Sequence, residues 1–269
     1  MFFLLFFLIM KRAYYLILLF CLLPKTSHAF DILGLQPVAP NGVFSTFSTD
    51  SLPRNRASFE VGFERSQDPD LDRFVLKGAY GFTDSIELDF TLPYVYDFLG
   101  SIDGLEDVAF GLKHRFYDEG KYGPSLAYIL NASIPSGREE FTTHGQFGGG
   151  LVISKRVGPF EGHLNIFFEK PGTGTLRNEI LFSGGLEFSA AHNFKLLGEF
   201  IAEKSHFSNH YDRLETRLGY RIKTTNFIDT TLGFGFGMDK RKPEVRILLS
   251  AAFTSLREKR NIKTIYEEE

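Results

Sequence analysis

The ionisable side chains of this chain follow a two-residue spacing, which limits the chemistry they can perform together. Glu87 and Asp89 alternate with apolar residues, and Arg213, Arg217 and Arg221 stand four residues apart. Side chains at i, i+2 and i+4 of a β-strand point to the same face of a sheet. Such groups can neutralise one another as ion pairs, or they can line a wet, charge-separated passage that orients solutes.

We predict that one inward set of these side chains lines a lumen, and the sequence leaves open whether that lumen is plugged by paired charges or forms an open channel. Acids prevail in its early and middle part and bases in its late part. Its members are Glu60, Glu64, Lys77, Glu87, Asp89, Lys113, Arg115, Glu161, His163, Glu187, Glu199, Arg213, Glu215, Arg217, Arg221 and Arg246.

Catalysis is the competing interpretation, because outer-membrane phospholipases carry a serine, a histidine and an asparagine on the outer wall of a barrel. His114 has the outward parity of Phe110 and Leu112, whereas Ser154 has inward parity. The two side chains would then lie on opposite faces of the wall. We therefore predict no catalytic residues, no cofactor and no metal site, and a chain that is not an enzyme.

The elements that position these groups are amphipathic strands. From about Ala57 to Phe253, bulky apolar residues take the alternate positions, and 30 of the 269 residues are phenylalanine. A soluble core cannot accommodate the charged series, and water does not suit the apolar series. A transmembrane antiparallel up-and-down β-barrel, apolar outside and polar inside, satisfies both. The length predicts about twelve strands, at roughly 20 residues for each strand with its connection.

The connections alternate in length, which is typical of outer-membrane barrels. Short turns are predicted on the periplasmic side and longer loops on the extracellular side, so that an even number of strands leaves both ends in the periplasm. The longer loops are predicted at 66–72, 93–104, 135–145, 170–177, 204–211 and 238–243.

The termini are predicted to lie outside the barrel, which spans 56–254. Residues 1–29 form a secretory signal peptide with a basic pair, an apolar run and the small-residue site Ser27-His28-Ala29, and translation could begin at Met10. Residues 30–55 form a lead-in rich in proline and glycine, in the periplasm or at the pore mouth, and 255–269 form a charged periplasmic tail. The single cysteine, Cys21, leaves with the signal peptide, which excludes disulfides afterwards.

Three segments resemble motifs of the outer-membrane family named for the MetA pathway of phenol degradation. Ala79–Leu88 is similar to that family's YGxTDxxEL turn, Gly104–Lys113 to its GxGDxxxGxK strand entry, and Ala132–Gly137 to its LPTG loop entry. Glu106 departs from the second motif, where the family more often has glycine. The resemblance implies a monomeric outer-membrane barrel that takes up hydrophobic or aromatic compounds.

We therefore expect passive passage of small, hydrophobic or aromatic solutes through a charge-lined lumen in the outer membrane of a Gram-negative bacterium. The alternative is a structural or assembly-related barrel with a blocked lumen. The expected partners are outer-membrane lipids, the barrel-assembly machinery during insertion and a small-molecule solute, and no nucleic acid is expected for a chain with a net charge of −3.

Overall fold

The structure is a computed structural model that describes residues 34–67, 70–98, 101–206, 208–238 and 245–255. The predicted signal peptide with its alternative start at Met10, the first part of the lead-in and nearly all of the charged tail lie outside these residues. Within the described part of the chain, none of the helices has the length and apolar character needed to cross a membrane.

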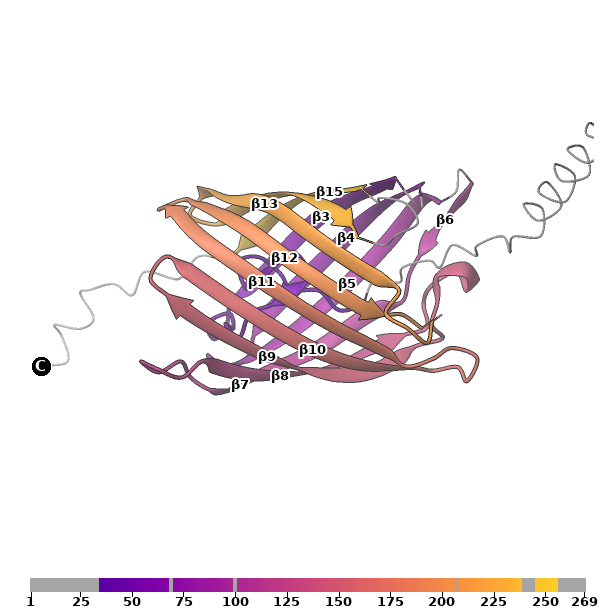
Figure 1. Cartoon of the computed structure of the whole chain (residues 1–269), viewed down its shortest axis with the longest axis horizontal. Helices are drawn as coiled ribbons and strands as arrows, with labels where there is room; N and C mark the ends of the chain where they lie inside the picture. Colours follow the sequence, from indigo (N-terminus) through magenta and orange to yellow (C-terminus); the bar gives the residue numbers. More distant parts are fainter. Residues whose placement is uncertain (1–33, 68–69, 99–100, 207, 239–244, 256–269) are drawn as a thin grey trace, which may run out of the picture.

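Twelve antiparallel strands close into a single barrel, which confirms the predicted fold (Figure 1). Each strand pairs with its neighbour in sequence, and β15 returns to pair with β3. The wall strands are β3 (Ala57–Gln67), β4 (Asp70–Gly81), β5 (Ile86–Phe98), β7 (Val108–Tyr117), β8 (Ser125–Ile134), β9 (Gln146–Val157), β10 (Phe160–Pro171), β11 (Glu179–Ala191), β12 (Phe194–Lys204), β13 (Arg213–Thr225), β14 (Ile228–Gly237) and β15 (Val245–Thr254).

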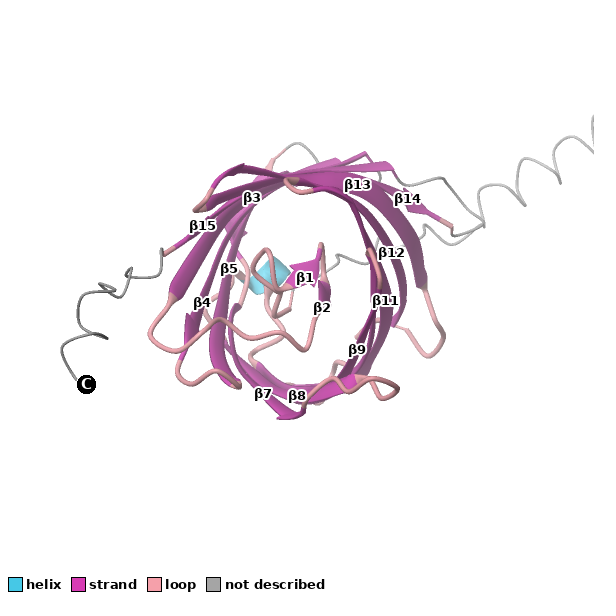
Figure 2. Ribbon diagram, turned by 90° about the vertical axis from the view of Figure 1, so that its left-hand side faces the viewer, coloured by secondary structure: helices cyan, strands magenta, loops and turns pink. Residues whose placement is uncertain are grey.

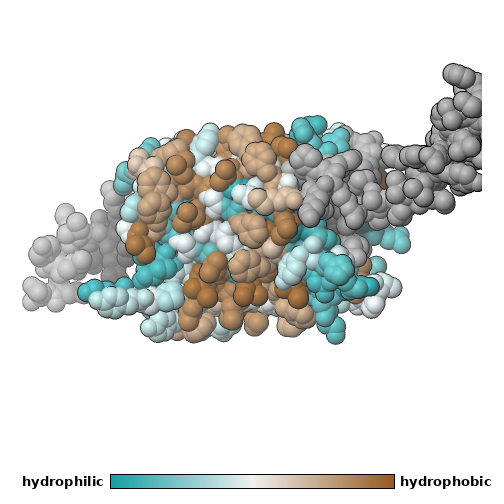
Figure 3. Space-filling view, in the orientation of Figure 1, coloured by the Kyte–Doolittle hydropathy of each residue, from teal (hydrophilic) through white to brown (hydrophobic). Residues whose placement is uncertain are grey.

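Alternation along each strand separates an apolar outer face from the barrel interior. On β9, Leu151 is 58% exposed whereas the next residue, Val152, is fully buried. Cross-strand partners share a face, so Leu151 lies between outward Tyr128 and Ile166. On the face shown in Figure 3, apolar residues fill much of the middle of the barrel, and hydrophilic residues lie towards both ends. A band of this kind is what hydrocarbon solvates best.

The two ends of the barrel differ. At one end, tight connections join β4 to β5, β9 to β10, β11 to β12 and β13 to β14, and aromatic pairs lie beside them. Phe160 and Phe188 stack with their ring centroids 4.8 Å apart, and Phe194 stacks on Tyr220 at 5.7 Å. We call this end the short-turn end and the opposite one the long-loop end.

Two predicted loops at the long-loop end are mostly strand. The predicted loop 66–72 is almost absent, because β3 and β4 continue pairing as far as Gln67 and Asp70. In the predicted loop 93–104, β5 continues to Phe98 and pairs with the short strand β6 (Ile102–Leu105). Backbone pairing extends the wall there although the polar side chains suggest loops.

The lead-in enters the barrel, and its first described part, residues 34–52, lies within the lumen (Figure 2). We call residues 34–52 the plug. The plug contains a small hairpin of β1 (Gly42–Val43) and β2 (Thr46–Phe47), whose residues are buried. It runs from beside β10 near the long-loop end, where Gly34 lies close to Glu169, to the short-turn end, where Leu52 lies against Gly81. The plug therefore lies deeper than the predicted position in the periplasm or at the mouth, because the inner wall carries groups that bind its backbone.

Candidate functional site in the barrel lumen

Carboxylates on the inner wall hold the backbone of the plug. Glu199 Oε1 accepts from the backbone N–H groups of Ser45 at 2.8 Å and Thr46 at 2.6 Å. Glu60 Oε2 accepts from Ala39 N at 2.7 Å, and Glu87 Oε2 accepts from Leu52 N at 2.5 Å. An irregular segment enclosed in a barrel needs partners for its N–H groups, and ionised acceptors make the stronger hydrogen bonds.

Basic side chains bind the carbonyl and hydroxyl groups of the same segment. Arg221 donates to Gly42 O at 2.6 Å and to Pro40 O at 3.3 Å. Arg217 donates to Ser45 Oγ at 2.6 Å, and Lys113 Nζ donates to Asp50 O at 2.6 Å. Acids of the predicted lumen set therefore bind the N–H groups of the plug, and bases of the same set bind its carbonyl and hydroxyl groups.

Apolar side chains of the plug fill spaces that inward-facing glycines leave open. A Cβ at Gly233 would lie 2.3 Å from the ring of Phe44, and a Cβ at Gly111 would lie 2.2 Å from Leu35. Glycine in a strand often marks close approach of another chain segment. These glycines are therefore sockets for the plug, and a side chain at either position would collide with it.

Replacement of Gly233 by valine should loosen the plug without deleting any of it. The valine would occupy the space of the Phe44 ring, and overpacking of this kind costs about 1–3 kcal/mol. We expect a cysteine introduced by Ser48→Cys, which is 3% exposed in the wild type, to react with a maleimide about tenfold faster. Gly162→Val is the matched control because a Cβ there meets no atom within 4 Å. Equal labelling rates in both variants would contradict the socket assignment.

A belt of ion pairs crosses the seam where the last strand meets the first. The belt runs through Glu199, Arg217, Glu215, Arg246, Glu64, Arg73 and Glu106. Arg246 on β15 bonds Glu64 on β3 at 2.6 Å, and Arg73 on β4 bonds Glu106 at 2.6 Å. Each of these side chains is at most 7% exposed, so the charges are compensated by one another inside the wall.

Most of the remaining predicted lumen residues form ion pairs with one another. Lys77 pairs with Glu60 at 2.8 Å, Lys113 with Glu87 at 2.6 Å and Arg221 with Glu187 at 3.3 Å.

Three others lie towards the ends of the lumen. Arg115 pairs with Asp118 at 2.8 Å, Arg213 pairs with Glu203 at 3.0 Å, and Glu161 pairs with Arg156 at the short-turn end. Asp89 is 3% exposed, and neither of its carboxylate oxygens has a hydrogen-bond partner among the described residues.

The histidine and serine considered for catalysis do not meet. His114 lies on the outer side, where Nδ1 is 3.1 Å from Tyr128 Oη, whereas Ser154 is buried in the lumen and contacts His163 Nδ1 at 2.8 Å. Ser154 Oγ also accepts from the plug, at Thr49 N. The Nε2 atom of His163 has no hydrogen-bond partner among the described residues, so this pair has no third, orienting residue.

A second segment narrows the lumen at the long-loop end. Residues 135–145 fold inward, and Phe141 is fully buried against Leu71, Val95 and Phe98. The carboxylate of Asp107 accepts from Thr142 Oγ1 at 2.7 Å, from Thr143 N at 2.9 Å and from Thr143 Oγ1 at 2.8 Å. This loop matches its predicted residue range, but its inward fold has no signal in the alternation pattern.

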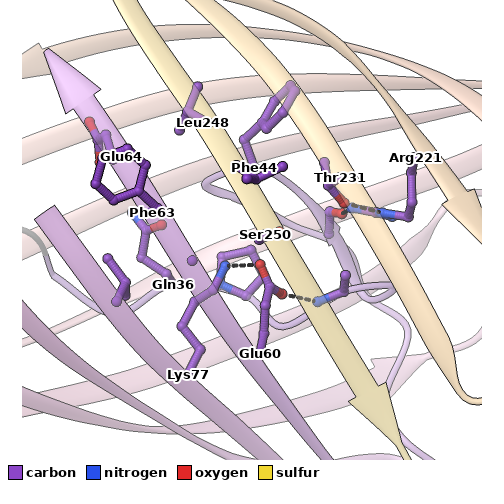
Figure 4. A pocket seen from close by; sticks show the side chains of 16 residues that line it. Gln36, Phe44, Glu60, Phe63, Glu64, Lys77, Arg221, Thr231, Leu248 and Ser250 are labelled. Carbon is purple, nitrogen blue, oxygen red and sulfur yellow. Dashed lines mark hydrogen bonds and ion pairs between the residues drawn. The ribbon is translucent and has the colours of Figure 1, made fainter.

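Space remains beside the plug. One partly open cavity lies between the plug and β3, β4, β13, β14 and β15 (Figure 4). The Lys77–Glu60 pair and Arg221 face it together with the apolar side chains of Phe44 and Leu248. The cavity therefore presents both ionic and apolar surface.

Sequence reasoning missed two features of the interior. Arg73 and Glu106 belong to the ion-pair belt, and parity along β4 with Lys77 would have identified Arg73. The inner wall is also not uniformly polar. Ala127, Ile129 and Val152 face inward and pack on the plug residue Phe47. An apolar inner patch is satisfied because a segment of the same chain covers it.

The closed twelve-stranded wall with its apolar outer face defines the fold of a transmembrane antiparallel β-barrel. Among solved structures, NanC porin aligns with 74% of this chain and 100% of its own length, at 9% identity and a TM-score of 0.58. KdgM porin aligns with 74% of this chain and 99% of its own length, at 11% identity and a TM-score of 0.56. KdgM porin in complex with disordered oligogalacturonate gives a TM-score of 0.54 at 10% identity over the same shares. At such identities the likeness establishes the fold alone.

The sequence itself matches no family model and no curated protein in these comparisons. The family resemblance of the turn and strand motifs therefore stays a prediction.

Proposed function

We propose that this protein is an outer-membrane channel for small solutes whose lumen is closed by its own plug. The observation that carries the proposal is the way in which the plug is held. Its contacts with the wall are hydrogen bonds to polar and charged side chains and apolar contacts at glycine sockets. Among the described residues, no wall strand pairs with it as a sheet. Water could replace those hydrogen bonds, so the plug can leave while the wall stays intact.

The outer surface supports the location in a membrane. The apolar band and the aromatic pairs at the short-turn end suit hydrocarbon and the headgroup region respectively. The solved structures with this fold include porins, and one of them was solved with oligogalacturonate. The charged inner wall favours solutes with polar groups, and departure of the plug would uncover the apolar wall patch of Ala127, Ile129 and Val152 for an aromatic or hydrophobic part.

A barrel with a permanently blocked lumen is the second candidate. The ion-pair belt and the inward loop 135–145 favour it, because both reduce the open cross-section independently of the plug. In that case the barrel would have a structural or assembly-related role and no solute would pass.

Deletion of residues 34–52 behind an intact secretory signal separates the two candidates. We expect the deletion protein to conduct ions in planar bilayers and to admit small sugars in liposome swelling, whereas the full chain stays closed most of the time. The matched control is Gly162→Val, which leaves plug and lumen untouched. If the deletion protein folds, as heat-modifiable gel migration would show, and still passes no current, the channel proposal is wrong and the blocked barrel remains.

A further inference from the structure

A second cavity beside the plug has an excess of carboxylates over bases. It lies between the plug and strands β10–β13 and is partly open. Glu169, Glu179, Glu203 and Arg213 line it. Three acids and one base therefore line this cavity.

The acids of this cavity differ in how they are paired. Glu203 lies 3.0 Å from Arg213 Nη1, and Glu179 lies 2.8 Å from His206 Nε2. Glu169 has no basic residue in hydrogen-bond contact among the described residues. Its Oε1 accepts from Asn131 Nδ2, whereas its Oε2 has no hydrogen-bond partner there although the residue is 6% exposed. The cavity therefore contains a buried acceptor that needs a donor.

A neighbour of Glu169 also lacks a hydrogen-bond donor. Asn131 Oδ1, on the amide that already donates to Glu169, is a second buried acceptor without a partner. The Oε2 atom of Glu169 is directed at the plug, because it lies 3.6 Å from the position of a Cβ on Gly34. Of the two residues, Glu169 lines the cavity. A ligand with an N–H donor satisfies its Oε2 atom, and a charged donor makes the stronger hydrogen bond to a carboxylate.

The opposite wall of the cavity is apolar. Phe47 and Phe167 have their ring centroids 5.8 Å apart, and Leu181 and Ile201 lie beside them. Such surface suits a hydrocarbon or aromatic body, and aromatic faces also attract cations. Acceptors on one side and apolar groups on the other define a ligand with the matching polarity.

We propose that this cavity binds a small organic cation, with its ammonium group on Glu169 and its apolar body against Phe47 and Phe167. If this cation is also the solute that passes through the channel, the inference rests on the proposed function. Binding of the cation in the cavity does not depend on that function, because a closed barrel can also bind a ligand there.

Calorimetry of the full mature chain in detergent tests the proposal with three compounds of similar shape. We expect saturable binding of benzylammonium, binding of neutral benzyl alcohol that is at least about tenfold weaker, and no binding of benzoate. Glu169→Gln should weaken benzylammonium binding by at least about tenfold, the factor for one lost hydrogen bond to a charged group. Glu161→Gln, which changes a lumen acid at the short-turn end, should leave the affinity unchanged.

A second variant guards against misfolding at the Glu169 site. Gly34→Lys places an ammonium beside Glu169 in ordinary van der Waals space and should abolish benzylammonium binding, whereas Gly34→Met should weaken it far less. Equal affinity for benzylammonium and benzyl alcohol would reduce the site to an apolar void and overturn the proposal. Absence of saturable binding would overturn it as well. If instead the plug-deletion protein does not conduct, the proposed channel function is wrong, whereas binding of benzylammonium at Glu169 is unaffected.

Discussion

Arg246→Met is expected to destabilise the barrel by about 3–5 kcal/mol, the cost of removing one partner from a buried ion pair. Arg246 is 2% exposed, its Nη1 lies 2.6 Å from Glu64, and its Nε lies 3.6 Å from Glu215. Methionine would fill much of the space but would leave both carboxylates without this base. The loss falls on the seam between β15 and β3, where the barrel closes. Urea unfolding of the refolded protein in lipid vesicles, followed by heat-modifiable gel migration, measures the change.

Two further variants separate the buried charge from the seam itself. Adding Glu64→Gln to Arg246→Met should recover part of the lost stability, because one carboxylate no longer needs a base. Arg65→Met lies on the same strand pair but outside, where the Arg65 side chain is 53% exposed and pairs with Asp72 at 3.5 Å. We expect that change to cost at most about 1 kcal/mol. A similar cost for Arg65 and Arg246 would refute the importance of the belt.

Leu151→Arg is expected to destabilise the protein in lipid by about 2–4 kcal/mol, the cost of an arginine on the lipid face near the midplane of a barrel. Leu151 stands midway along β9, 58% exposed, between Tyr128 and Ile166. A guanidinium there would be transferred from water into hydrocarbon, and no acid lies beside Leu151 in the cross-strand pairs on the outer face. Unfolding in vesicles measures the effect, and the yield of folded protein should fall with it.

The controls for this prediction keep either the position or the charge. Leu151→Phe retains an apolar side chain at the same place and should be tolerated. Tyr122→Arg introduces the same charge in the turn 118–124, at a residue that is 87% exposed, and should have little effect. If all three variants were equally stable in lipid, the outer face of β9 would not be in contact with hydrocarbon.

The faces of the wall were readable from the sequence because a strand has a period of two. Glu60 and Phe59 differ by one position, and one is buried while the other is half exposed. This rule is local, so it holds for each strand without any information about its neighbours. The number of strands and the closed barrel followed from counting such segments, and the structure confirms both.

The ends of strands and the partners of charges are less local. Whether Gln67 ends a strand depends on what lies across from it, and pairing with Asp70 makes the predicted loop into wall. Glu64, one partner of Arg246, comes from a strand that is far away in the sequence, and the two side chains meet only because the last strand returns to the first.

The lumen is where the sequence by itself reached its limit. The alternation pattern determined that acids and bases face inward, and the proline- and glycine-rich composition of residues 30–55 marked a segment that would not join the wall. Only the tertiary structure placed that segment over Gly111 and Gly233 and left Glu169 without a base. The physical reason is that strand periodicity is a property of neighbouring residues, whereas occupancy of an enclosed space depends on every element that surrounds it.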